Sequence, residues 1–210
     1  MTDEQVSINY DNYIKYLRAY LKGTDGLDKL VEYLNGSDLK VAPASTKYHM
    51  AEKGGLVQHS LNVFNNLISL VKVKYGDIDK SPFSKRTIAL VALLHDVSKI
   101  GLYKESYRNV KDDATGEWKK VTCYVTADSP LLYSTHEVNS VYILNQFIPL
   151  TYEEQIAIMY HSGAYSAKDE YAIARLSLAF ETCPLALLLH EADMLATYFD
   201  ESKHGKEDKA

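Results

Sequence analysis

The sequence has few cysteines and no long apolar run, and both absences narrow the kinds of protein it can be. The two cysteines, Cys123 and Cys183, lie far apart and form no CxxC motif. We therefore expect no disulfide framework and a reducing compartment. No apolar stretch approaches the roughly 20 residues of a membrane span, and the first residues lack the basic start of a signal peptide. These features predict a cytoplasmic protein without a membrane partner.

An excess of positive charge is also missing. The chain of 210 residues has 23 Lys and Arg against 28 Asp and Glu, which gives a formal net charge of −5. Proteins that bind duplex DNA non-specifically usually carry a basic field, so we expect no stable binding to duplex DNA. With 46% hydrophobic and 24% charged residues, the composition is that of a globular protein whose length fits one domain. The sequence predicts no particular oligomeric state.

Helical periodicity dominates what is present. Two N-terminal helices are expected within residues 4–35, and a loop over 38–53 follows them. The Gly54-Gly55 pair then opens a strongly apolar helix, and Ser81-Pro82 gives a start signal for the next one. A charged tail over 201–210 is expected to fray. Further helices are predicted over 137–147, 152–161, 171–179 and 185–199.

Residues 106–126 have the only convincing strand signal in the chain. Turn-forming residues over 112–116 separate two flanks rich in β-branched and aromatic residues, which predicts a β-hairpin. The hairpin is either a solvated projection or a flap that contacts substrate, and in the second case Arg108 is a substrate-binding candidate. Because it follows the central motif directly, we expect it to form one wall of the pocket. Its cations are Lys104, Arg108, Lys111, Lys119 and Lys120.

The segment 89–100 joins an apolar run to ionisable residues. Residues 88–94 offer no polar face, which predicts a helix buried nearly all round. His95 and Asp96 follow at its end, where an uncompensated charge is costly. A divalent transition metal ion would compensate both groups, because imidazole and carboxylate are ligands for zinc, iron, manganese and nickel. Taken alone, the pair is equally compatible with a buried histidine bonded to its neighbour.

Other expected helices also carry a histidine or an aspartate at or near an apolar face. Any one of these residues could be a satisfied core residue. Buried His and Asp are each uncommon without a partner, so their recurrence predicts one shared site. The candidate metal ligands are His59, His95, Asp96, His136, His161 and Asp193.

The order of these residues resembles the HD-domain superfamily of metal-dependent phosphohydrolases. Gly54-Gly55-Leu56-Val57-Gln58-His59 looks like the glycine-led first motif of HD-domain 3′–5′ exonucleases. Leu94-His95-Asp96-Val97-Ser98-Lys99-Ile100 looks like the second motif, with Ser98 in place of a common Gly. His190-Glu191-Ala192-Asp193-Met194-Leu195-Ala196 matches the Ala-Asp-x-Leu end motif. The resemblance covers about residues 50–200 and is greatest to uncharacterised bacterial and phage HD hydrolases.

This resemblance implies an all-α, HD-type helical bundle with a small β-hairpin insert, in a single domain over residues 1–210. His59, His95, Asp96 and Asp193 would hold one metal ion, and His136 and His161 a second one, with Asp96 bridging. The ions would be Mn, Fe, Ni or Zn. The implied reaction is cleavage of a phosphoester by metal-bound hydroxide. The substrate would be a phosphorylated small molecule such as a nucleotide, or a short single-stranded oligonucleotide. The Gly-Tyr-Pro signature of cyclic-dinucleotide hydrolases is absent after His161.

Three further residues are placed beside this ligand set. Lys99 would contact the phosphate or its developing charge, which makes it catalytic together with Asp96. Alternatively, Lys99 pairs with a carboxylate and only steadies the helix end. His49, in the loop before the first motif, is a candidate substrate contact, whereas His190 is expected to be packed or supporting.

Two other functions stay open at this point. One is a non-catalytic HD-type sensor that binds a nucleotide or a partner without turnover. The other is a di-iron oxygenase, since a few HD proteins oxidise their substrates. Six convergent ligands exceed the physical need of a binding module, which favours the hydrolase.

Overall fold

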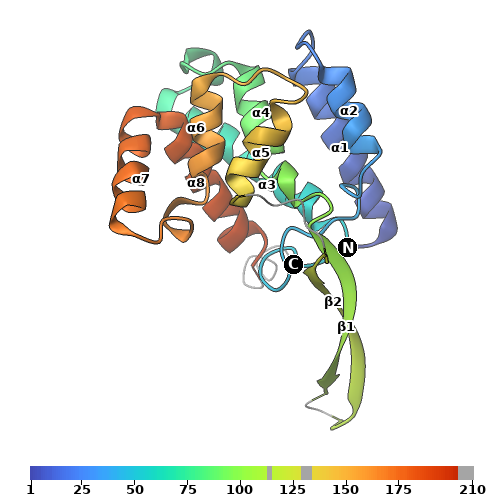
Figure 1. Ribbon diagram of the computed structural model, residues 1–210. Helices are drawn as coiled ribbons and strands as arrows, with labels where there is room; N and C mark the ends of the chain where they lie inside the picture. The colour runs from blue at the N-terminus through green and yellow to red at the C-terminus, as the bar shows by residue number, and fades with distance from the viewer. Residues whose placement is uncertain (113–114, 129–133, 203–210) are drawn as a thin grey trace.

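The computed structural model is mostly helical and has one two-stranded antiparallel hairpin (Figure 1), which confirms that part of the prediction. The structure describes residues 1–112, 115–128 and 134–202. The helices are α1 (Asp3–Tyr20), α2 (Leu27–Asn35), α3 (Gly55–Tyr75), α4 (Lys85–Leu94), α5 (His136–Leu144), α6 (Tyr152–Tyr160), α7 (Glu170–Thr182) and α8 (Pro184–Leu195). Shorter turns are η1 (Ile78–Lys80), η2 (Val97–Lys99), η3 (Gly163–Tyr165) and the π-helical η4 (Ala196–Asp200).

The apolar core is built around α4, whose residues 88–94 are each at most 1% exposed. Helix α3 packs against both α4 and α8, and α1 packs against α4. The Tyr13 hydroxyl of α1 donates to the Leu93 carbonyl at 2.8 Å, which ties α1 to the end of α4. The prediction of a buried helix leading into His95 is confirmed.

Polar residues flank helix α4 at both ends. It begins later than predicted, because the Ser84 hydroxyl accepts from the Thr87 amide at 3.0 Å, whereas Ser81 closes the turn η1. At its other end Asp96 leaves the helical conformation, with φ −107° and ψ 17°. The 3₁₀ turn η2 follows, so the residues after Asp96 do not keep α-helical spacing.

The C-terminal helical segment ends close to its predicted end, but the residue after it is buried. After α8 the chain passes through η4 to Glu201, which is only 7% exposed. The prediction that the charged tail frays from Glu201 onward is therefore wrong at that residue. Residues 203–210 of the predicted tail and 129–130 of a predicted helix approach lie outside the described residues.

The hairpin consists of β1 (Tyr103–Lys111) and β2 (Trp118–Thr126), paired from Tyr103↔Thr126 to Lys111↔Trp118. It extends away from the helices in Figure 1. Gly101, with φ 68°, turns the chain between η2 and β1 in a conformation that favours glycine.

Membrane-span criteria are met by none of the described helices alone. Only α7 and the α8–η4 helix taken together reach the required length and apolar composition, and they bend by 107° where they meet.

Candidate metal centre

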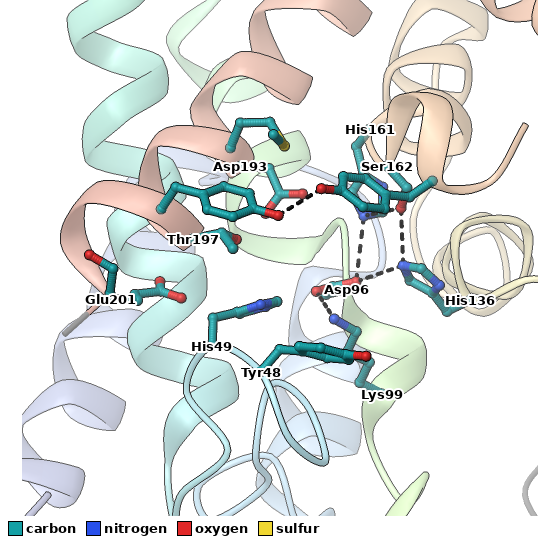
Figure 2. Close-up of a pocket in the computed structure, with 14 residues that line it drawn as sticks. Tyr48, His49, Asp96, Lys99, His136, His161, Ser162, Asp193, Thr197 and Glu201 are labelled. Carbon is teal, nitrogen blue, oxygen red and sulfur yellow. Dashed lines mark hydrogen bonds and ion pairs between the residues drawn. The ribbon is translucent and has the colours of Figure 1, made fainter. Parts of the chain in front are cut away.

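The six predicted ligand residues converge on one place in the helical body. His59 comes from the inner face of α3, and His95 and Asp96 follow α4 directly. His136 begins α5, His161 ends α6, and Asp193 lies in α8. Figure 2 shows Asp96 amid Lys99, His136 and His161.

The two carboxylate oxygens of Asp96 face different histidines. Oδ2 lies 3.3 Å from His95 Nε2 and 3.8 Å from His59 Nε2. Oδ1 lies 3.5 Å from His136 Nε2 and 3.6 Å from His161 Nε2. Asp193 adds a carboxylate oxygen 3.1 Å from His59 Nε2. Asp96 therefore stands between two sets of nitrogen and oxygen atoms.

Hydrogen bonds at Nδ1 orient the histidine rings. His95 Nδ1 donates to the Ala92 carbonyl at 2.9 Å, and His161 Nδ1 donates to the Ile158 carbonyl at 2.7 Å. Because a carbonyl only accepts, these bonds fix the proton on Nδ1 and leave the Nε2 lone pair directed at Asp96. His59 Nδ1 similarly lies 3.0 Å from a Glu201 oxygen. A bonded Nδ1 with a free Nε2 is the usual arrangement of metal-binding histidines.

Two buried atoms at this focus lack a hydrogen bond. Among the described residues, neither His95 Nε2 nor Asp96 Oδ1 has a hydrogen-bond partner. An unsatisfied buried polar group costs about 1–3 kcal/mol, and here acceptor atoms face one another. A cation would satisfy both atoms at once. The imidazole and carboxylate set suits zinc, iron, manganese or nickel.

The charge around the focus also favours a cation. Four carboxylates each contact a histidine ring nitrogen, and they belong to Asp96, Glu137, Asp193 and Glu201. Among the described residues, Lys99 is the one lysine that pairs with any of them. Burial works against protonation of His59, but Glu201 and Asp193 outweigh it and raise the pKa of His59 to about 10. Since a ligand nitrogen must be unprotonated, metal binding would displace a proton from His59.

Two supporting carboxylates were missed from the sequence. Glu201 accepts from Asn62 Nδ2 at 2.9 Å as well as contacting His59. Its signal was the spacing of Asp193, Thr197 and Glu201, which places them on one face of a continued helix. Glu137 is fully buried with Oε2 3.4 Å from His136 Nδ1, and no spacing in the sequence marks it.

A cavity of about 640 Å³ lies over the focus, a size typical of small-molecule sites. Its lining includes Asp96, His136, His161 and Asp193 together with Ser162. Three exposed tyrosines also line it: Tyr48, Tyr165 and Tyr198 are 81%, 69% and 53% exposed. The Tyr165 and Tyr198 hydroxyls lie 2.6 Å apart and share a hydrogen bond.

Lys99 both pairs with a carboxylate and lines the cavity. Its Nζ lies 2.6 Å from Asp96 Oδ2, and the side chain also lines the cavity. The residue is only 9% exposed, so the pair is buried and is no surface contact. Lys99 reaches Asp96 over the 3₁₀ turn η2, whereas α-helical spacing from His95 was predicted.

His49 lies beside the centre. Its ring is 4.7 Å from that of His59, and the residue lines the cavity. Burial lowers the pKa of His49 to about 4, which keeps the ring neutral at physiological pH. Its buried Nε2 has no hydrogen-bond partner in the described part of the chain. His190 instead donates from Nδ1 to the His161 carbonyl at 2.7 Å and stacks on Phe180.

The structure does not bring Arg108 to the centre. Arg108 is exposed on β1, and no described residue of β1 or β2 lines the cavity. The prediction that the hairpin forms a wall of the pocket is therefore wrong. The two strands hydrogen-bond to each other and run outward from their base, so only that base is near Lys99.

Comparison with known proteins assigns no family. No family model matches the chain, and neither a curated protein nor a solved structure matches it. The geometry of the centre and the resemblance of its motifs therefore carry the functional argument.

Proposed function

We propose that this protein is an HD-type, metal-dependent phosphohydrolase that cleaves a phosphoester of a nucleotide or a short single-stranded oligonucleotide. The observation that carries the proposal is the convergence of six ordered His and Asp residues on unpaired, buried acceptor atoms, His95 Nε2 and Asp96 Oδ1. Buried polar atoms without hydrogen bonds call for an explanation, and a bound cation would satisfy both of them.

The residues divide into two sets that would each hold a divalent ion. His59, His95 and Asp193 would bind one ion together with Asp96 Oδ2. His136 and His161 would bind another with Asp96 Oδ1. When bound, such ions lower the pKa of water and polarise a phosphoryl oxygen.

The chain's own residues would position the substrate. The Lys99 ammonium, held beside Asp96, would face the negative charge that develops on the phosphoryl group. The neutral His49 ring, with its unpaired Nε2, would offer a hydrogen bond to the substrate. The exposed rings of Tyr48, Tyr165 and Tyr198 suit stacking on a nucleobase, which favours nucleotides over sugar phosphates.

The test is metal analysis of anaerobically purified protein followed by a substrate screen with Mn²⁺. Mononucleotides, nucleoside triphosphates and short single-stranded oligonucleotides are compared, and Asp96→Asn is the inactive control. We expect bound transition metal and phosphoester hydrolysis that the control lacks. Metal without turnover would instead indicate a sensor, and oxygen uptake would indicate a di-iron oxygenase. Protein that binds no transition metal would contradict the proposal.

A further inference from the structure

The hairpin carries cations along its two strands, whereas Asp112, Asp113 and Glu117 between the strands offset most of this charge. Its paired strands contain five cationic side chains and one carboxylate, Glu105, although the whole chain has a formal net charge of −5. Two of the cations, Lys104 and Lys119, are paired with carboxylates. Such a charge distribution fits an anionic partner. Within the described residues, no ion pair engages the other three cations, which are Arg108, Lys111 and Lys120.

The strand register sorts these side chains onto two faces. Opposed residues of an antiparallel pair point to the same side, and the side alternates along each strand. The pairs Lys111↔Trp118, Asn109↔Lys120 and Tyr107↔Thr122 therefore share one side. We call this side the aromatic face and define it by Tyr107, Lys111, Trp118 and Lys120. The opposite side, the valine face, carries Arg108, Val110, Lys119 and Val121.

The aromatic face exposes two large rings and also carries Glu105, which accepts from the Tyr107 hydroxyl at 2.6 Å. Trp118 is 70% exposed and Tyr107 is 55% exposed. The Lys120 ammonium lies 4.3 Å from the centroid of the Tyr107 ring. Sites for single-stranded nucleic acid combine aromatic rings for base stacking with cations that follow the phosphates. A duplex keeps its base faces stacked inside, so it would leave these rings unused.

We propose that the aromatic face binds single-stranded nucleic acid, with bases stacked on Trp118 and Tyr107 and phosphates paired with Lys111 and Lys120. This inference deepens the proposed function and rests on it only for the fate of the strand, whose end would be the phosphoester that enters the cavity. An acidic protein could also pair with the lysines, but it has no bases to stack on the two rings.

The sequence supplies a probe for this proposal, because Trp118 is the only tryptophan. The full chain, with metal chelated to prevent hydrolysis, is titrated with an oligothymidylate of about 12 nucleotides. Stacking on Trp118 should quench its fluorescence to saturation. Inorganic polyphosphate and a duplex of equal length should produce little quenching. No quenching by the oligonucleotide, or equal quenching by polyphosphate or duplex, would overturn the proposal.

Variants locate the binding on one face. Trp118→Ala should weaken oligonucleotide binding about tenfold, and Trp118→Phe should restore most of it, since a ring is what stacking needs. Lys120→Gln should lower the slope of log affinity against log salt by about 0.7, as for one lost phosphate contact. Lys119→Gln removes the same charge from the valine face and should have a much smaller effect. Equal effects of the two lysine variants, or failure of Trp118→Phe, would count against the aromatic face.

Kinetics separate this proposal from the proposed function. Trp118→Ala should raise KM for an oligonucleotide relative to a mononucleotide, whereas Val110→Ala on the valine face should leave both values unchanged. If no phosphoester is hydrolysed but the oligonucleotide still quenches Trp118, the hydrolase proposal fails and the binding face stands. Hydrolysis of oligonucleotides with KM unaffected by Trp118→Ala would overturn the binding face alone. A wild-type dimer in sedimentation that Trp118→Ala dissociates would also overturn it, by assigning the face to a second copy.

Discussion

Two buried polar clusters of this protein satisfy their carboxylates in opposite ways. Glu154, at the start of α6, is fully buried, and both its oxygens have donors. Oε1 accepts from Arg86 at 2.7 Å and Thr87 at 2.9 Å, and Oε2 accepts from the Thr151 amide at 2.9 Å. Asp96 is buried almost as deeply, yet its Oδ1 faces two histidine nitrogens without a hydrogen bond.

The difference is the one expected between a structural carboxylate and a carboxylate that binds a cation. Burial and neighbouring ionisable residues are common to both clusters, so neither property identifies a functional site. What differs is the balance of donors and acceptors: Glu154 is saturated with donors, whereas the Asp96 cluster directs acceptors at a common point. A folded chain tolerates the second arrangement where a bound cation relieves it.

The largest effect should come from removing the central carboxylate charge. Asp96→Asn keeps the side-chain shape but weakens both ion sites, so hydrolysis should fall by about 10³-fold or more, the equivalent of several kcal/mol of transition-state stabilisation. The matched change in the other cluster, Glu154→Gln, should keep metal content and turnover. Steady-state kinetics and metal analysis of both variants test the comparison. Equal losses of turnover and metal in the two variants would contradict the distinction between the clusters.

Lys99 is the cation of the Asp96 cluster, and its removal should have the next largest effect. Lys99→Ala should keep the metal content at saturating metal and lower turnover by about 10²-fold, as for the loss of one preorganised donor to developing charge. Lys85→Ala, which breaks a surface pair with Asp79, is the control. Near-normal turnover with a lowered melting temperature would mean that Lys99 serves only its pair with Asp96.

A change in the Glu154 cluster should instead lower the stability of the fold. Glu154→Ala leaves the partly buried Arg86 without its carboxylate and removes the capping box of α6. The free energy of unfolding should fall by about 2–3 kcal/mol. Denaturant titration measures this loss, and metal stoichiometry of the folded variant should stay at the wild-type value. A variant that unfolds normally but loses metal would mean that the two clusters are coupled.

Sequence reasoning reached the Asp96 cluster because its signals are local. The apolar run over 88–94 predicts a buried helix, and ionisable residues at the end of such a helix need compensation. Periodicity likewise placed His59 on the inner face of α3. The saturated Glu154 cluster carries its own local signal, Thr151 followed three residues later by Glu154, which is typical of a capping box.

Features that depend on the direction of the backbone could not be predicted from local sequence signals. Glu201 was assigned to a frayed tail because charged residues follow it, yet the π-helical turn carries the helix on to its contact with His59. The strand pairing of the hairpin is local and was predicted, whereas its direction follows from the turn at Gly101. The ion pair of Lys99 likewise depends on the 3₁₀ turn after Asp96.

Glu201 offers a smaller effect on the same cluster. Glu201→Gln keeps a hydrogen-bond acceptor for His59 Nδ1 but removes a carboxylate charge beside the predicted ion site, so metal affinity should fall about tenfold. Asp200→Asn removes a charge from the adjacent residue, whose carboxylate bonds to Asn66 at 2.8 Å, and should change affinity less. Competition with a chromogenic chelator measures both. Equal affinities for the two variants would show that Glu201 contributes only general charge.

The smallest expected change is a halving of the metal content, which tests whether Asp96 divides the cluster into two ion sites. Its Oδ2 belongs with His59 and His95, and its Oδ1 with His136 and His161. Replacing both His136 and His161 by Ala therefore removes every imidazole on the Oδ1 side. We expect metal content to fall from two ions per chain to one and the circular dichroism spectrum to remain unchanged. Unchanged metal stoichiometry would mean that a single ion sits on the Oδ2 side and that His136 and His161 line the cavity for the substrate.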